Sequence, residues 1–196
     1  LLSILSERQL QIPELQGEDG VLYAREGFNV IATSNSLDRG LFDMSAALKR
    51  RLNFETIEPI DDLDAELDIV QRESSLLARQ SGVEMAADPA ILDMLVTVFH
   101  ELRNGQTLSG RSTDRLAAAV MSTAEAVAVA HALMVYAWYY RSGKMAPEDL
   151  LHFIIGAALK DNPQDRRRVR HYFDTEVSGK QGAHWQQLYE QRHLLD

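Results

Sequence analysis

The stretch that decides the fold is Phe28-Asn-Val-Ile-Ala-Thr-Ser-Asn35, together with Ala46-Ala-Leu-Lys-Arg-Arg51 further along the chain. The first segment is short, rich in β-branched residues and uncharged until its end, which predicts a buried strand that delivers Asn35 to a loop. An Asn at the end of a central strand can orient water beside a phosphate. An Arg that reaches a phosphate from a neighbouring subunit can stabilise transition-state charge. Asn35 and the Arg50-Arg51 pair are therefore considered together.

These residues resemble the second half of an AAA+ ATPase core of the MoxR branch. In that branch a strand ends in Ala-Thr-x-Asn-Pro, and Ala-Leu-x-x-Arg-Phe follows; here Ser36 replaces the Pro and Leu52 replaces the Phe. The resemblance implies that Asn35 is sensor 1 and that Arg51 is the arginine finger, with Arg50 beside it. Taken singly, a strand-terminal Asn more often caps a turn and paired arginines more often form a solvated face. Their order, spacing and hydrophobic frame favour the joint interpretation.

The phosphate-binding half of such a site has no counterpart in this sequence. A phosphate loop needs Gly-x-x-x-x-Gly-Lys-Ser/Thr, because backbone N–H groups and one lysine surround the phosphates. Gly143-Lys144 is followed by Met and Gly179-Lys180 by Gln, and neither has the first glycine. No Walker B strand ending in Asp-Glu is present. Leu1 to Arg8 resembles the helix that follows Walker B in the family. We therefore expect a fragment that is inactive towards ATP by itself.

Composition places the chain among globular proteins with a sizeable core. The 196 residues are 45% hydrophobic and 25% charged, with a formal net charge of −9 and no cysteine. No apolar run reaches the roughly 18 residues of a membrane span, and no signal peptide is recognisable, so a cytoplasmic location is expected. The negative charge disfavours general nucleic-acid binding. The absence of cysteine excludes disulfides and thiolate ligands, and the scattered histidines predict no metal site.

A predicted hairpin and a predicted last strand lie near the two ends of the expected core region. Gln9 to Leu15 and Val21 to Ala24 alternate apolar and polar residues around Gly17-Glu-Asp-Gly20, which predicts a hairpin. In the MoxR branch a hairpin in this place lies towards the ring pore, although an ordinary sheet edge is the simpler interpretation. Ile57-Glu-Pro59 is expected to be the last core strand and a hinge. The expected domains are residues 1–59, a partial core, and residues 60–196, a helical lid with a C-terminal extension.

After Asp61 the periodicity changes to that of helices. Carboxylates in a first turn favour the positive end of the helix dipole, and Ser-x-x-Glu is a capping box. Trp138, Tyr139 and Tyr140 end an Ala- and Val-rich segment, so they are expected in the core and not as a stacking platform. The expected starts are Asp61-Asp62 with Asp64, Asp88-Pro89, Ser122-Thr-Ala-Glu125, Pro147, Asn162-Pro163 and Gly182, and the expected stops are Asn104-Gly105 and Gly143.

The lid departs from the MoxR pattern at one position. The family usually has Ser-Pro-Arg-Ala there, and its Arg is sensor 2, which reaches the nucleotide; the matching residue here is Ala124. Either sensor 2 is absent or an arginine of the Gly110 to Arg115 loop replaces it. Arg111 and Arg115 are the candidates for nucleotide binding, with Arg103 as a weaker one. Without the resemblance, the loop composition favours a solvated, flexible segment.

The expected fold is α+β: the C-terminal part of a three-layer α/β P-loop NTPase core, followed by an all-helical lid. The resemblance implies an intact protein that hydrolyses ATP with Mg and works as a homo-oligomeric ring in remodelling or insertion. The Ser122 region, Lys160-Asp161 and Asp165 are similar to MoxR-like ATPases associated with von Willebrand A-domain proteins, which implies such a partner. The alternatives are the motor subunit of a metal chelatase and a non-enzymatic helical interaction module.

Overall fold

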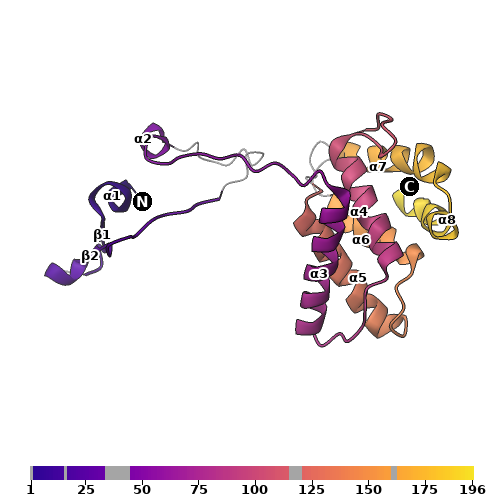
Figure 1. Ribbon diagram of the computed structural model, residues 1–196, viewed down its shortest axis with the longest axis horizontal. Coiled ribbons are helices and arrows are strands. Elements are labelled where there is room, and N and C mark those ends of the chain that lie inside the picture. The colour runs from indigo at the N-terminus through magenta and orange to yellow at the C-terminus, as the bar shows by residue number, and fades with distance from the viewer. Residues whose placement is uncertain (1, 16, 34–44, 115–120, 160–162) are drawn as a thin grey trace. The chain divides into compact units, whose positions relative to one another are not determined.

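The computed structural model describes residues 2–15, 17–33, 45–114, 121–159 and 163–196. The chain forms two compact units, Leu1–Ile57 and Glu58–Asp196, which we call the N-terminal unit and the helical unit (Figure 1). Their boundary falls within the predicted hinge, Ile57 to Pro59. Each unit is described by itself.

A helix and a small hairpin form the first part of the N-terminal unit. Helix α1 (Leu2–Glu7) leads into strand β1 (Gln9–Gln11), which pairs antiparallel with β2 (Val21–Tyr23) and places Leu10 opposite Leu22. A 3-10 turn, η1 (Gly17–Gly20), connects the strands. A Cβ atom at Gly20 would lie 2.7 Å from the Leu15 carbonyl oxygen, so the close approach of the backbone requires glycine. The predicted hairpin is confirmed, with short strands.

The predicted buried strand from Phe28 to Asn35 is wrong over its described residues. Phe28 to Thr33 form no strand, and Ile31 is 93% exposed. Ile57 to Pro59, expected to be a last core strand, are likewise outside any strand. A strand exists only where a neighbour accepts and donates its ladder hydrogen bonds, and the two-stranded hairpin is the sheet found among the described residues. Helix α2 (Ala46–Lys49) is the last regular element among the described residues of this unit.

The helical unit is built from six α-helices and two short 3-10 segments in the described ranges. α3 packs against α4 and α5, α5 against α6, and α6 against α8 (Figure 1). The elements are α3 (Leu63–Gln80), α4 (Pro89–Asn104), α5 (Thr123–Tyr140), α6 (Pro147–Ala158), α7 (Pro163–Thr175), η2 (Val177–Gly179), α8 (Ala183–Glu190) and η3 (Gln191–Leu195).

Local caps start α3, α4 and α5 where the sequence predicts. Asp62 Oδ1 accepts a hydrogen bond from the Ala65 amide at 3.1 Å, and Asp88 Oδ1 accepts one from the Ala90 amide at 2.9 Å. The capping box of α5 is complete: the Glu125 amide donates to Ser122 Oγ at 3.2 Å, and the Ser122 amide donates to Glu125 Oε2 at 2.8 Å. Gly105, at φ 67°, ends α4 in the left-handed conformation that glycine adopts without strain.

The buried apolar core lies entirely in the helical unit, between Val70 and Leu195. Helix α4 is its centre, since most of its residues from Ile91 to Leu102 are buried. Tyr172, Phe99 and Phe173 are the largest fully buried side chains. Burying each large apolar side chain contributes roughly 1.5–3 kcal/mol, so this unit carries most of the hydrophobic stabilisation of the described chain.

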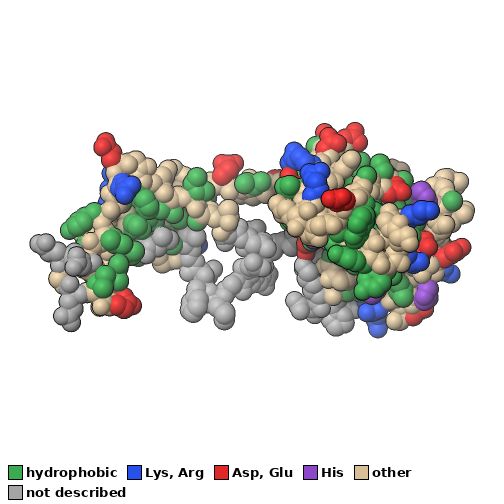
Figure 2. Space-filling model, turned by 90° about the horizontal axis from the view of Figure 1, so that it is seen from below, with side chains coloured by type: hydrophobic (Ala, Val, Ile, Leu, Met, Phe, Trp, Pro, Cys, Tyr) green, Lys and Arg blue, Asp and Glu red, His purple; other side chains and the backbone are tan. Residues whose placement is uncertain are grey.

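The aromatic end of α5 contradicts the expectation of a core position. Trp138, Tyr139 and Tyr140 are 38%, 65% and 75% exposed. Leu133, Met134 and Ala137 set the buried face of α5, and the helical period turns the next residues away from it at the last turn. Hydrophobic side chains are thus visible on the surface of the helical unit (Figure 2). Among the described residues, no helix combines the length and the apolar character that a membrane crossing requires.

Candidate functional site

The predicted arginine finger lies just after α2 in the N-terminal unit. Ser45 caps this helix, with its Oγ accepting a hydrogen bond from the Leu48 amide at 3.3 Å. Arg51 Nη1 donates to the Ala47 carbonyl at 2.8 Å, and Arg51 Nε donates to Ser6 Oγ of α1. The Arg51 side chain is therefore held between α1 and its own helix, on an exposed surface. Arg50 is also exposed.

Two of the predicted site residues lie outside the described residues. These are Asn35, the predicted sensor 1, and Arg115, one of the two candidates for a nucleotide-binding arginine. Ala124, at the usual sensor 2 position, lies in the first turn of α5 and is exposed.

The loop that carries Arg111 is hydrogen-bonded over its described part, residues 105–114. The Thr107 amide donates to the Arg111 carbonyl at 2.8 Å, and the Thr113 amide donates to the Gly105 carbonyl at 2.9 Å. Thr107 is buried, and its Oγ1 accepts from the Arg111 amide at 3.0 Å. The loop is solvated as expected over most of these residues, and its turn also closes on itself through its own backbone and Thr107.

Arg111 projects from this turn towards Glu176 at the end of α7. Arg111 Nη2 lies 2.7 Å from Glu176 Oε2, and the side chains are 64% and 9% exposed. The contact is an ion pair whose geometry is not that of a hydrogen bond. An exposed guanidinium that is held by one carboxylate can exchange that carboxylate for a phosphate, since both are oxygen anions that an Arg fork accepts.

Arg103 occupies a different environment, in the interior of the helical unit. Its Nη1 donates to Glu66 Oε1 at 2.9 Å and to the Met121 carbonyl at 2.9 Å. Its Nη2 donates to Glu66 Oε2 at 2.7 Å and to the Ile60 carbonyl at 3.1 Å. A buried guanidinium with four such contacts cannot reach a nucleotide unless they are dismantled. This geometry argues against Arg103 as a substitute for sensor 2.

The partner of Arg103 is a fully buried carboxylate. Burial of Glu66 by itself raises its pKa, but hydrogen bonds from Arg103 and Thr123 and the positive charge of Arg103 outweigh burial, so the pKa lies below its ordinary value. Thr123 Oγ1 donates to Glu66 Oε1 at 2.8 Å. His100 Nδ1 lies 3.8 Å from Glu66 Oε2 on the same side. Glu66 is therefore ionised in the folded protein at neutral pH.

A second buried carboxylate, Glu101, holds the turn and α7 together. Glu101 Oε2 accepts from Tyr172 Oη at 2.5 Å, and Oε1 accepts from Lys180 Nζ at 3.0 Å and from the Leu108 amide at 3.1 Å. Sequence analysis did not identify either carboxylate cluster. The signal was present in α4, because Glu101 and Arg103 interrupt an apolar segment, and charged residues on such a face are normally paired.

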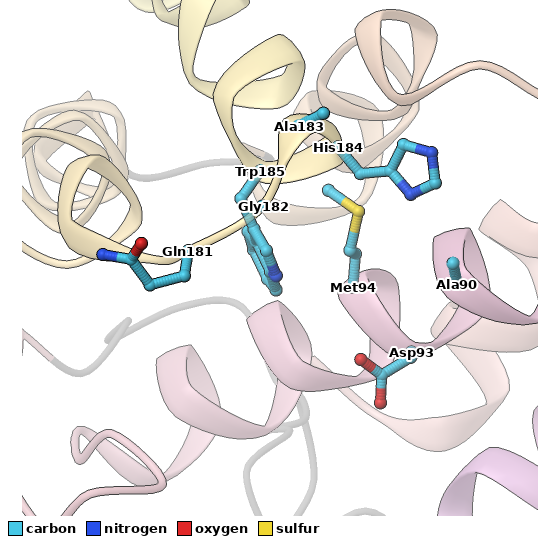
Figure 3. A pocket seen from close by; sticks show the side chains of 8 residues that line it. All are labelled: Ala90, Asp93, Met94, Gln181, Gly182, Ala183, His184 and Trp185. Carbon is cyan, nitrogen blue, oxygen red and sulfur yellow. The ribbon is translucent and has the colours of Figure 1, made fainter.

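A small surface cavity of about 240 Å³ lies where the start of α4 meets the start of α8. Figure 3 shows Met94 and Trp185 lining it, with His184 and Asp93 among the labelled residues around it. Lys180 Nζ lies 4.9 Å from the centre of the Trp185 ring. In the part of the chain that the structure describes, no group of three or more His, Asp or Glu side chains could hold a metal ion.

Known proteins match both units. Residues 64–196 match the YehL-like AAA+ ATPase C-terminal domain, and residues 1–52 match the AAA domain of the dynein-related subfamily. The chain is 49% identical over 196 residues to the uncharacterized protein YehL of Escherichia coli (strain K12). The alignment covers 100% of this chain and 53% of that relative, so the chain spans about half of the relative's length. No solved structure matches the chain. With a C-terminal domain match over more than half of its residues, the chain belongs to the YehL-like AAA+ ATPases.

Proposed function

We propose that the complete protein is an ATP-hydrolysing remodelling or insertion ATPase of the MoxR type that works as a homo-oligomeric ring. The observation that carries the proposal is the order of the two matched domains along the chain. An AAA domain match over residues 1–52 contains the Asn35 and Arg50-Arg51 motifs, and an AAA+ C-terminal domain match over residues 64–196 contains the helical unit. A three-layer α/β core is part of the proposal for the complete protein.

In this proposal Asn35 orients the attacking water, and Arg51 of one subunit reaches the γ-phosphate bound by its neighbour, with Arg50 beside it. Positioning and electrostatic stabilisation are most of what phosphoryl transfer requires from a protein. In the same proposal, Arg111 and Arg115 of the helical unit bind the nucleotide. Mg bound with ATP would neutralise phosphate charge in the complete protein, and none of the described carboxylates is proposed as its ligand.

The finer assignments rest on sequence resemblance. A von Willebrand A-domain protein is the proposed partner, because Ser122-Thr-Ala-Glu-Ala126, Lys160-Asp161 and Asp165 resemble the sequences of MoxR-like ATPases associated with such proteins; Lys160 and Asp161 lie outside the described residues. The proposed location is the cytoplasm. A chelatase motor subunit would share the same ATPase branch and would likewise work with a von Willebrand A-domain partner, so that partner does not separate it from a MoxR-type remodeller.

The test is ATP hydrolysis by the protein expressed from its full coding sequence. The expected result is Mg-dependent turnover that rises more steeply than linearly with protein concentration in the range where the ring assembles, because Arg51 acts in trans. A full-length protein that neither binds nor hydrolyses ATP would leave the helical interaction module as the function.

A further inference from the structure

The Glu66–Arg103 pair connects segments that are far apart in the sequence. Arg103 of α4 contacts Glu66 of α3 through two parallel hydrogen bonds, and it also holds the carbonyls of Ile60 and Met121. Glu66 in turn accepts a hydrogen bond from Thr123, the first residue of α5. One buried cluster therefore joins α3, α4, the start of α5 and the segment that precedes α3.

Two of these contacts are made to backbone that lies just before a helix begins. Ile60 lies between the unit boundary at Ile57–Glu58 and the start of α3. Met121 has φ 49°, a left-handed conformation that is unfavourable for a residue with a side chain, and it directly precedes the Ser122 cap. Such a conformation persists only where the surroundings determine it. The hydrogen bond from Arg103 to the Met121 carbonyl is one of the contacts that do so.

A buried ion pair is a poor explanation for stability alone. Removing two charges from water costs free energy that their attraction seldom exceeds, and well-packed apolar side chains of similar volume often serve the fold as well or better. An arginine fork, however, fixes direction: its planar donors must align with the carboxylate and with both carbonyls at once. The chemistry of this cluster is therefore better suited to setting geometry than to holding the core together.

We infer that Glu66 and Arg103 are positioning residues. They hold the interdomain backbone at Ile60 and the first turn of α5 in a single geometry. Under the proposed function, on which this part rests, that geometry sets how the helical unit is presented to the nucleotide-binding core during turnover. Neither side chain touches nucleotide; both act through the backbone of residues 60–62 and 121–125.

The test uses the full-length protein with Glu66→Leu and Arg103→Met combined, which replaces the pair by apolar side chains. The matched control is Arg141→Gln with Asp149→Asn, which removes a partly exposed ion pair of the same unit. Amide hydrogen exchange is followed at Ala65, Glu66, Ser122, Glu125 and Ala126, whose amides are hydrogen-bonded in the two segments. Thermal unfolding, nucleotide affinity and ATP turnover are measured on the same samples.

In the apolar pair variant we expect exchange at these amides to accelerate by about tenfold or more, with the thermal midpoint and exchange in the centre of α6 unchanged. ATP turnover should fall by roughly tenfold to a hundredfold while nucleotide affinity is retained, because a misplaced helical unit disturbs the geometry of the reacting groups. The single variant Arg103→Lys should also have low turnover, since an ammonium group cannot make the two parallel hydrogen bonds of the arginine fork.

Unchanged exchange at the amides of residues 65 and 66 and of residues 122, 125 and 126 would overturn the inference. Normal ATP turnover by an active protein in which the pair has been replaced would also overturn it. If the unmodified protein does not hydrolyse ATP, the proposed function fails, and the exchange data still decide whether the pair fixes these segments. Should the double variant not fold, Arg103→Lys is read by the same exchange and turnover measurements, with the same outcomes.

Discussion

Tyr172 and Glu101 face each other in the interior of the helical unit, where Tyr172 Oη donates to Glu101 Oε2 at 2.5 Å and joins α7 to α4. Lys180 balances the charge of Glu101, and the Leu108 amide supplies a third donor. The carboxylate thereby tethers the Arg111 turn and the segment after α7 to the central helix. A buried charge is tolerated here because its oxygens are hydrogen-bonded and a cation lies beside them.

Tyr172→Phe should destabilise the helical unit by about 1.5–3 kcal/mol, because it removes a hydrogen bond to a charged acceptor and keeps the ring. Urea unfolding followed by circular dichroism measures the change. Tyr139→Phe is the matched control: that hydroxyl is exposed, and its loss should change stability by less than about 0.5 kcal/mol. Equal stability of the two variants would show that the buried contact contributes nothing.

The same hydroxyl predicts a pH dependence at alkaline pH. Burial of Tyr172, followed by the nearby charge of Glu101, holds its pKa well above its ordinary value of 10.0. Because the folded state favours the protonated phenol, this stabilisation is complete below the unfolded pKa and is lost progressively as pH rises from there through the raised folded pKa. The stability difference between the unmodified protein and Tyr172→Phe should therefore shrink above pH 10.0. A difference that stays constant from neutral to strongly alkaline pH would contradict this.

Ser122→Ala should cost about 0.5–2 kcal/mol, because the Glu125 amide loses its acceptor at the start of α5. Ser122→Thr retains the hydroxyl and is expected to recover most of that loss. Thermal and denaturant unfolding measure both variants. If the Ala and Thr variants prove equally stable, the capping box does not stabilise the protein.

Arg51→Ala in the full-length protein should lower ATP turnover by roughly 10³-fold or more while leaving nucleotide binding largely intact, as expected for an arginine that acts only on the transition state. Lys49→Ala, an exposed cation two residues before Arg51 at the end of α2, is the control and should keep normal turnover. Measurements of steady-state hydrolysis and of binding of a fluorescent ATP analogue separate the two effects. Unchanged hydrolysis in Arg51→Ala removes the assignment of Arg51 as the arginine finger.

Arg111→Ala should weaken ATP binding by about tenfold if the exposed guanidinium contacts phosphate, which corresponds to one charge-assisted hydrogen bond. Glu176→Gln should strengthen binding, because it removes the carboxylate that competes for Arg111. Equilibrium binding titrations with the full-length protein measure both variants, with Arg79→Ala on α3 as an exposed-arginine control. Opposite signs for Arg111→Ala and Glu176→Gln support the assignment; identical affinities oppose it.

Some expectations could be reached from sequence because their physics is local. Asp62, Asp88 and Ser122 cap their own helices through amides two or three residues away, so the pattern contains both partners of each bond. The hairpin is local in the same sense, with its turn between its strands. The Asn35 and Arg51 motifs were recognised by order and spacing, and their roles stay predictions.

The sequence by itself determined where the helices of the helical unit begin, where α4 ends, the position of the hairpin and the family motifs, since each depends on residues that are close together along the chain. Only the tertiary structure decided the rest. It pairs Glu66 with Arg103 and Tyr172 with Glu101 across long separations, turns Tyr139 and Tyr140 outward at the end of α5, and leaves Phe28 to Thr33 without a ladder partner. A side chain's partner, its burial and a strand's pairing all depend on what another segment supplies, and no local pattern contains that segment.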